Sequence, residues 1–97
     1  LSLHDALPIS YYAEFSHVAT YHHENMDGSG YPEGLKGNDI PLCARIIRVV
    51  ESYVSLVNSR SFHKGLKPKA AVAALKRETN IYDMQVVDAL GSLATLS

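Results

Sequence analysis

The chain has little cysteine, no long apolar run and no excess of charge of either sign. Cys43 is the one cysteine in 97 residues, which excludes an intramolecular disulfide and a cysteine-based zinc site and fits a cytoplasmic location. No segment reaches the roughly 20 apolar residues that span a bilayer, so we expect no membrane segment. Nine Lys and Arg against ten Asp and Glu indicate no basic face for DNA or RNA.

The first residues predict that the chain is part of a longer domain. It begins without Met, and His4 and Asp5 interrupt the apolar start that a secretory signal would need. The opening LSLHDALPI is what the codons CTT TCC CTA CAC GAC GCT CTT CCG ATC encode, a string similar to a sequencing-library adapter read in frame. We therefore predict that residues 1–9 are an adapter-derived artefact and that residues 10–97 form a partial domain with a modest core.

A helical pattern precedes a pair of histidines. Tyr11, Phe15, Val18 and His22 recur at spacings of four, three and four residues, which is the apolar stripe of an amphipathic helix. This spacing predicts a helix from Tyr11 to about residue 24. His22 continues its apolar face.

Glycine is concentrated in one segment, residues 26–40, which holds four glycines and a proline in fifteen positions. This is too many for a regular helix, and it predicts an ordered loop with a functional role. Asp39 is a candidate N-cap and Pro41 suits the first turn of a helix that runs to about Val57. We expect that helix to be the most buried element, with a solvated face formed by Arg45, Arg48, Ser52 and Ser55.

Two shorter helices follow. Pro68 is typical of the first helical position and predicts a helix to about Glu78, and Asp83 is a candidate cap for a last helix. The apolar residues of that last helix are Val86, Val87, Leu90 and Leu93. No strand pattern or repeat is found, so the fold class is predicted to be all-α, with about four helices and one long Gly-rich loop.

The adjacent His22 and His23 are the strongest sign of chemistry. Neutral imidazole is the commonest metal ligand. Two consecutive helical residues point about 100° apart, which suits two neighbouring metals better than one. The alternative is that His22 is a hydrogen-bonded core histidine and His23 a surface residue.

The residues after this pair follow a recognisable series. It comprises His22-His23-Glu24, Asp27-Gly28, Gly30-Tyr31-Pro32, Gly34-Leu35, Gly37, and Ile40-Pro41-Leu42 with Ala44-Arg45. The series resembles the signature of HD-GYP domains, a bacterial family of metal-dependent phosphodiesterases that cleave cyclic di-GMP. The resemblance runs from about Tyr11 to Leu93. It implies the C-terminal helical half of an HD-domain superfamily fold.

The resemblance also implies roles for individual residues. His22 and His23 would be metal ligands, Tyr31 would contact the dinucleotide, and Arg60 would contact a phosphate, with His63 or Lys64 as a weaker second basic group. The loop set is Glu24, Asp27, Gly28, Gly30 and Pro32, in which the two carboxylates orient the histidines or tie down the loop. Two or three iron or manganese ions, cyclic di-GMP, a sensory or receiver domain and dimerisation are implied for the intact signal-transduction protein.

The chain departs from the family after the loop. Where the family has Val-Ala-Asp, Asp-Ala-Leu-Thr-Ser and Arg-Pro-Tyr-Arg, the chain has Val49-Val50-Glu51, Val54-Ser55-Leu56-Val57-Asn58 and Arg60-Ser61-Phe62-His63. Glu51 is the candidate third ligand, but its extra methylene moves the carboxylate by roughly 1 to 1.5 Å, whereas metal–ligand distances vary by about 0.2 Å. An ion pair with Arg48, three residues earlier, is the alternative role.

Two hypotheses of function remain. The first is a fragment of a phosphodiesterase that hydrolyses cyclic di-GMP to pGpG or GMP and is inactive as this isolated chain, because the family's upstream ligands are missing. His4-Asp5 does not supply them, since it precedes His22 by only 18 residues and the family's His-Asp pair lies much further upstream. The second is a non-catalytic module that binds cyclic di-GMP or a protein partner.

Overall fold

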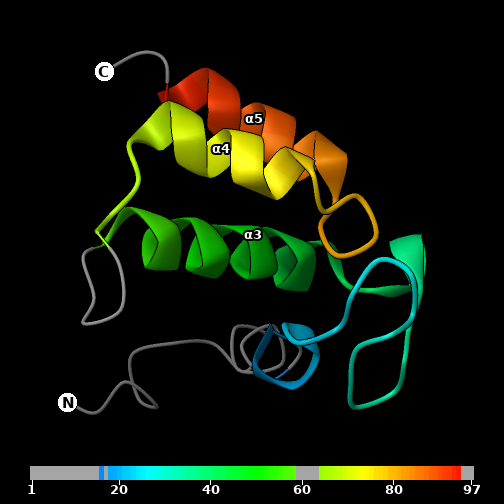
Figure 1. Ribbon diagram of the computed structural model, residues 1–97. Helices are drawn as coiled ribbons and strands as arrows, with labels where there is room; N and C mark the ends of the chain where they lie inside the picture. The colour runs from blue at the N-terminus through cyan, green and yellow to red at the C-terminus, as the bar shows by residue number, and fades with distance from the viewer. Residues whose placement is uncertain (1–15, 17, 59–63, 95–97) are drawn as a thin grey trace, which may run out of the picture.

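The computed structural model describes residues 16, 18–58 and 64–94. Residues 18–21 are the end of a helix, and a long loop leads through the 3₁₀ turn η1 (Gly37–Asp39) to α3 (Leu42–Val57), α4 (Pro68–Lys76) and α5 (Met84–Ala94) (Figure 1). Within these ranges the only β-type pairing is an isolated antiparallel bridge between Asp27 and Lys36. The predicted all-α class and the long Gly-rich loop are confirmed.

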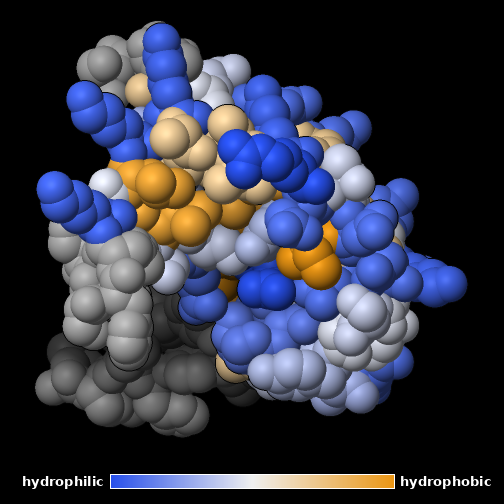
Figure 2. Space-filling model, viewed as in Figure 1, coloured by the Kyte–Doolittle hydropathy of each residue, from blue (hydrophilic) through white to orange (hydrophobic). Residues whose placement is uncertain are grey.

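The core lies where the three helices meet. α4 and α5 run side by side and both pack against α3 (Figure 1). Val49 of α3, Val72 and Leu75 of α4 and Val87 of α5 form the buried cluster. Apolar side chains also gather at the surface between α3 and α4, with hydrophilic side chains around them (Figure 2). The fold therefore places one face of α3 against α4 and α5. Other residues of this helix approach the histidine turn and the segment that follows it.

The starts of the two later helices agree with the sequence. Pro68 occupies the first turn of α4, where its missing N–H costs nothing. The Oδ1 atom of Asp83 accepts the N–H of Gln85 at 2.9 Å, so Asp83 is the predicted cap of α5. α4 ends at Lys76, two residues before the predicted end.

The start of α3 differs from the prediction. Asp39 belongs to η1 and does not cap α3. The N-cap is Pro41, whose backbone has φ −53° and ψ 139° and whose carbonyl accepts the N–H of Arg45 at 3.1 Å. The reason is the tight turn in front of the helix, in which the N–H of Ile40 bonds to the carbonyl of Gly37 at 3.1 Å. This turn leaves Asp39 two residues before the cap position.

The predicted burial of α3 is wrong in two respects. Its buried residues are Ala44 and Val49, whereas the shorter α4 buries Ala71, Val72 and Leu75. The apolar positions Leu42, Ile46, Val50 and Val54 are 55, 39, 38 and 44% exposed. Three of the residues expected to be solvated instead have partners in the loops or at the cap of α5: Arg45, Arg48 and Ser52. These polar residues lie inward because the loop and the start of α5 offer them acceptors and an aromatic hydroxyl.

The first helix ends earlier than predicted. Tyr21 is its last helical residue, and His22 and His23 form a turn. The N–H of His22 still bonds to the Val18 carbonyl at 3.1 Å, but Glu24 N–H reaches back three residues to Tyr21 at 3.0 Å. The chain leaves the helix just before Glu24, whose side chain bonds to backbone N–H groups of the loop. Tyr11 and Phe15 lie outside the described residues. Within the described ranges, no helix has the length and apolar character to cross a membrane.

Candidate functional site

A buried carboxylate fixes the Gly-rich loop beside the helix end. Glu24 is 2% exposed, and its two oxygens accept the backbone N–H groups of Glu33 at 2.9 Å and Leu35 at 3.2 Å. These bonds fold residues 33–35 back onto the turn that carries the histidines. The Glu33 carboxylate, which also accepts a hydrogen bond from Tyr21, raises the pKa of that phenol because an ionised oxygen would lie beside another negative charge.

At two positions of the loop the backbone favours glycine, for a different physical reason at each. Gly28 has φ +83°, a conformation that is costly for a residue with a Cβ. Gly30 lies so close to the histidine turn that a Cβ there would be 2.6 Å from both Asn25 N and Glu24 Cα. This approach lets the N–H of Tyr31 reach the His23 carbonyl at 3.4 Å.

The loop is also docked on the connection between α4 and α5. Met26 N–H bonds to the Ile81 carbonyl at 3.1 Å and Asp27 N–H bonds to the Asn80 carbonyl at 2.9 Å. The Asp27 carboxylate accepts the N–H of Ser29 at 2.9 Å, and the hydrogen bonds from Ser29 lower the pKa of Asp27 because they stabilise its charged form. The loop is therefore held by the protein at both its start and its middle.

His22 presents one nitrogen outward. Its Nδ1 atom lies 3.1 Å from the carbonyl oxygens of Val18 and Ala19. Since carbonyls only accept, this network places a proton on Nδ1, so the neutral form of the ring carries its lone pair on Nε2. Nε2 lies 3.9 Å from Oε2 of Glu51. A backbone carbonyl that fixes the tautomer in this way is the arrangement found behind metal-binding histidines.

His23 lies between His22 and the Tyr31 ring. The centroids of the two imidazoles are 4.0 Å apart with an interplanar angle of 40°. Tyr31, which is 61% exposed, stacks on His23 at 4.9 Å and 18°. The expectation of two rings diverging at the helical angle is wrong, because these residues follow the helix end and form a turn.

The three predicted ligands fit part of a metal site. The 3.9 Å between His22 and Glu51 is less than twice a metal–ligand bond of roughly 2.0 to 2.2 Å, so one ion can contact both. Across the described residues, however, no group of three His, Cys, Asp or Glu side chains converges on one point. The alternative ion pair between Arg48 and Glu51 is not formed, since Arg48 bonds to Asn25.

Of the other predicted residues, the structure describes only some. Arg60, His63 and the His4-Asp5 pair lie outside the described residues, so the adapter assignment stays a prediction. Lys64 is exposed, as is Pro32 after the cis bond that joins it to Tyr31. No pattern in the sequence indicates that Asn25 and Tyr82 hold Arg48. The position of Arg48 one helical turn before Glu51 indicates only that it lies near the candidate ligand.

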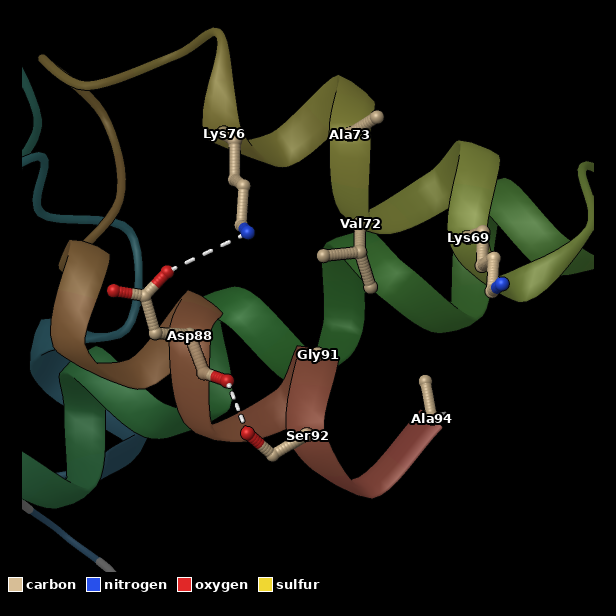
Figure 3. A pocket seen from close by; sticks show the side chains of 8 residues that line it. All are labelled: Lys69, Val72, Ala73, Lys76, Asp88, Gly91, Ser92 and Ala94. Carbon is tan, nitrogen blue, oxygen red and sulfur yellow. Dashed lines mark hydrogen bonds and ion pairs between the residues drawn. The ribbon is translucent and has the colours of Figure 1, made fainter. Parts of the chain in front are cut away.

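A separate groove lies between α4 and α5. Its volume is about 520 Å³, and Figure 3 shows Val72 of α4 pointing toward Gly91 of α5, with Lys76 reaching toward Asp88. The Lys76–Asp88 ion pair spans 3.7 Å between exposed side chains, so it contributes little to stability. None of the predicted site residues lines this groove. The candidate site is therefore the surface formed by the histidine turn, the Gly-rich loop and the middle of α3.

Comparison with known proteins finds relatives that are named as phosphodiesterases of cyclic dinucleotides. A family model described as HD domain matches residues 3–86. The chain is 42% identical over 74 residues to the cyclic di-GMP phosphodiesterase response regulator RpfG of Xanthomonas campestris pv. campestris (strain 8004), covering 75% of this chain and 20% of that protein. It is 41% identical over 73 residues to a probable cyclic di-GMP phosphodiesterase of Vibrio cholerae, covering 74% and 17%.

A third relative differs in its named substrate. The chain is 44% identical over 45 residues to the 3′3′-cGAMP-specific phosphodiesterase 2 of Vibrio cholerae, covering 46% of this chain and 9% of that protein. The chain thus spans a fifth or less of the length of these relatives. The family match and the all-α fold define a helical HD domain. Within that class, the paired histidines, the Gly-Tyr-Pro loop and the relatives show that the chain belongs to the HD-GYP family.

Replacing Glu24 by Gln is expected to loosen the loop. The amide keeps one acceptor oxygen but turns a donor toward one of the two N–H groups, and a buried group left unpaired costs about 1–3 kcal/mol. Hydrogen exchange should therefore become faster at Glu33 or Leu35. Asp39→Asn, an exposed change of the same chemistry, should leave both amides protected. Unchanged protection in Glu24→Gln would show that the carboxylate does not hold the loop.

Proposed function

We propose that this chain is part of a phosphodiesterase that hydrolyses cyclic dinucleotides, with cyclic di-GMP as substrate and pGpG or GMP as product. The approach of His22 Nε2 to the Glu51 carboxylate, at 3.9 Å, carries the proposal. It brings an imidazole nitrogen and a carboxylate oxygen, both of which are metal-ligand types, together beside a loop that presents an exposed aromatic ring.

The residues divide into metal-binding and substrate-binding groups. In the intact protein, His22, His23 and Glu51 would contribute ligands to two or three iron or manganese ions, which would supply an activated water and neutralise charge on the phosphate. Tyr31 offers an exposed face for stacking on a base. Arg60, His63 and Lys64 would neutralise the phosphates, with Arg60 suited to two hydrogen bonds with one phosphate.

The isolated chain is expected to bind metal weakly and to lack turnover. Catalytic metals take about three or more protein ligands each, and three candidate ligands cannot complete two such sites. Glu51 is also 58% exposed at its side chain, so its carboxylate stays largely hydrated. Tight binding and catalysis would need ligands from the rest of the intact protein.

A non-catalytic module is the second candidate. The glutamate at position 51, where the family has aspartate, and the altered residues 54–63 favour it. In that case the loop and Tyr31 would bind cyclic di-GMP or a protein without hydrolysis. The two candidates differ in whether metal binding depends on Glu51.

The test is a manganese titration of the full 97-residue chain followed by electron paramagnetic resonance. We expect His22→Ala and Glu51→Gln each to weaken Mn²⁺ binding about tenfold or more, and Asp39→Asn to leave it unchanged. Removal of a ligand or its support costs roughly this much in known metal sites. Equal affinity in all four proteins would contradict the proposed metal site.

A hydrolysis assay completes the test. With manganese added, the chain should release no pGpG or GMP from cyclic di-GMP and no product from 3′3′-cGAMP. Turnover that disappears in His22→Ala and His23→Ala would disprove the inactivity of the isolated chain and support a self-sufficient enzyme.

A further inference from the structure

Arg48 connects two parts of the candidate site. Its Nε and Nη2 atoms donate to Oδ1 of Asn25 at 3.3 and 3.0 Å. Asn25 lies two residues after His23, and Arg48 lies three residues before Glu51. The bridge therefore joins the turn that carries the histidines to the helical turn that carries the carboxylate.

Both ends of the bridge are fixed by further contacts. The Nδ2 atom of Asn25 donates to Ser29 Oγ at 3.1 Å, so the orientation of the amide is set on both sides. The Arg48 guanidinium lies over the ring of Tyr82, 5.5 Å from its centroid, and the Tyr82 hydroxyl donates to Ser52 of α3 at 2.9 Å. An arginine held over an aromatic face loses less freedom on forming its hydrogen bonds.

The backbone contacts of the loop do not replace this bridge. Met26 and Asp27 bond to Ile81 and Asn80, which anchors the loop to the connection between α4 and α5. Arg48 adds a link to α3 itself, within one helical turn of Glu51. The charge on the guanidinium also makes its bonds to Asn25 stronger than those between neutral groups.

We propose that Arg48 is a positioning residue, which acts through Asn25 to set the separation between the histidine pair and Glu51 and thereby the affinity for metal. This proposal rests on the proposed function, since it names a determinant of the same site. Arg48 itself donates to Asn25 and contacts no metal. If its role were stability alone, its loss would lower the unfolding midpoint without a specific change in metal binding.

A double-mutant cycle tests the proposal on the full 97-residue chain. The variants are Arg48→Met, which keeps an apolar stem and removes the donors, Asn25→Ala, and the two combined. Arg48→Lys restores one donor, and Arg77→Met is the matched control, because Arg77 is exposed beyond the end of α4. Mn²⁺ affinity, amide exchange of residues 23–29 without metal and the urea midpoint are measured for each.

We expect Arg48→Met and Asn25→Ala each to weaken Mn²⁺ binding about tenfold, as outer partners of metal ligands do. The double variant should be no weaker than either single one, because both remove the same bridge. Arg48→Lys should fall between wild type and Arg48→Met, and Arg77→Met should match wild type. Independent effects that multiply in the double variant would overturn the proposal, as would a lower urea midpoint with unchanged affinity.

The metal-free measurement separates this proposal from the proposed function. Faster exchange at residues 23–29 that is equal in both single variants and in the double variant supports the bridge whatever the metal result. Exchange effects that multiply overturn it. Mn²⁺ affinity in the wild-type chain that is insensitive to His22→Ala instead contradicts the proposed function.

Discussion

Asp83→Ala is expected to lower the free energy of unfolding by about 3–5 kcal/mol, the cost of breaking a buried ion pair from one side. Asp83 Oδ2 lies 2.7 Å from Arg45 Nη1, and the two side chains are only 8 and 14% exposed. Oδ1 of Asp83 caps α5 through Gln85. The substitution therefore removes a helix cap and leaves a guanidinium largely out of water, with the Ile40 carbonyl as its remaining acceptor.

Urea unfolding near the temperature of maximum stability would measure this effect. Asp88→Ala on the same helix is the control, because its ion pair with Lys76 is 3.7 Å long and both side chains are more than half exposed, so it should cost less than about 1 kcal/mol. Asp83→Asn keeps an oxygen for the cap and should lie between the two. Equal midpoints for the alanine variants at positions 83 and 88 would show that the buried pair adds nothing.

The local signals in the sequence were sufficient for the later helices. A proline in the first turn of α4 and an aspartate in front of α5 act within one or two residues of where they stand, so their effect does not depend on the rest of the fold. The same holds for the loop of residues 26–40, whose glycines exclude a regular helix. Family membership could be recognised for a similar reason, since the motif is continuous from His22 to Arg45.

The faces of α3 could not be predicted because they depend on distant partners. Helical periodicity assigns the polar Arg45 and Arg48 to solvent, but Asp83 and Asn25 approach them from segments 38 and 23 residues away. Helical periodicity finds a polar face and an apolar face without deciding which one the neighbouring elements cover. Here the inward polar residues are compensated by hydrogen bonds, and the apolar stripe at Leu42, Ile46 and Val50 remains partly exposed.

For the candidate site, too, the sequence predicts some features and not others. The residue types at positions 22, 23, 31 and 51 followed from the motif, but the relation between them did not. The two imidazoles are not separated as helical neighbours, because Glu24 turns away to hold the loop amides. That turn brings His23 between His22 and Tyr31, an arrangement that no periodicity of the sequence indicates.

Gly30→Ala is the second change with a large expected effect. Its Cβ would meet only backbone atoms, with Asn25 N and Glu24 Cα both at 2.6 Å, so no flexible side chain can move aside. Forcing an extra carbon into a packed position costs about 1–3 kcal/mol, and occasionally more. The loop must shift away from the histidine turn, which should break the Tyr31–His23 stack as well as lower stability.

Gly37→Ala provides the matched comparison, since a Cβ there meets nothing within 4 Å while φ is +50°. Its cost comes from the left-handed backbone, about 1–2 kcal/mol, and Gly37→Asn should recover part of it because Asn tolerates that region. The ring-current shift of His23 separates the two sites: it should change in Gly30→Ala and stay constant in both variants of Gly37. If Gly30→Ala keeps the wild-type shift and unfolds no earlier than Gly37→Ala, the close packing of the loop on the histidine turn is wrong, and with it the means by which Tyr31 is held beside the candidate ligands.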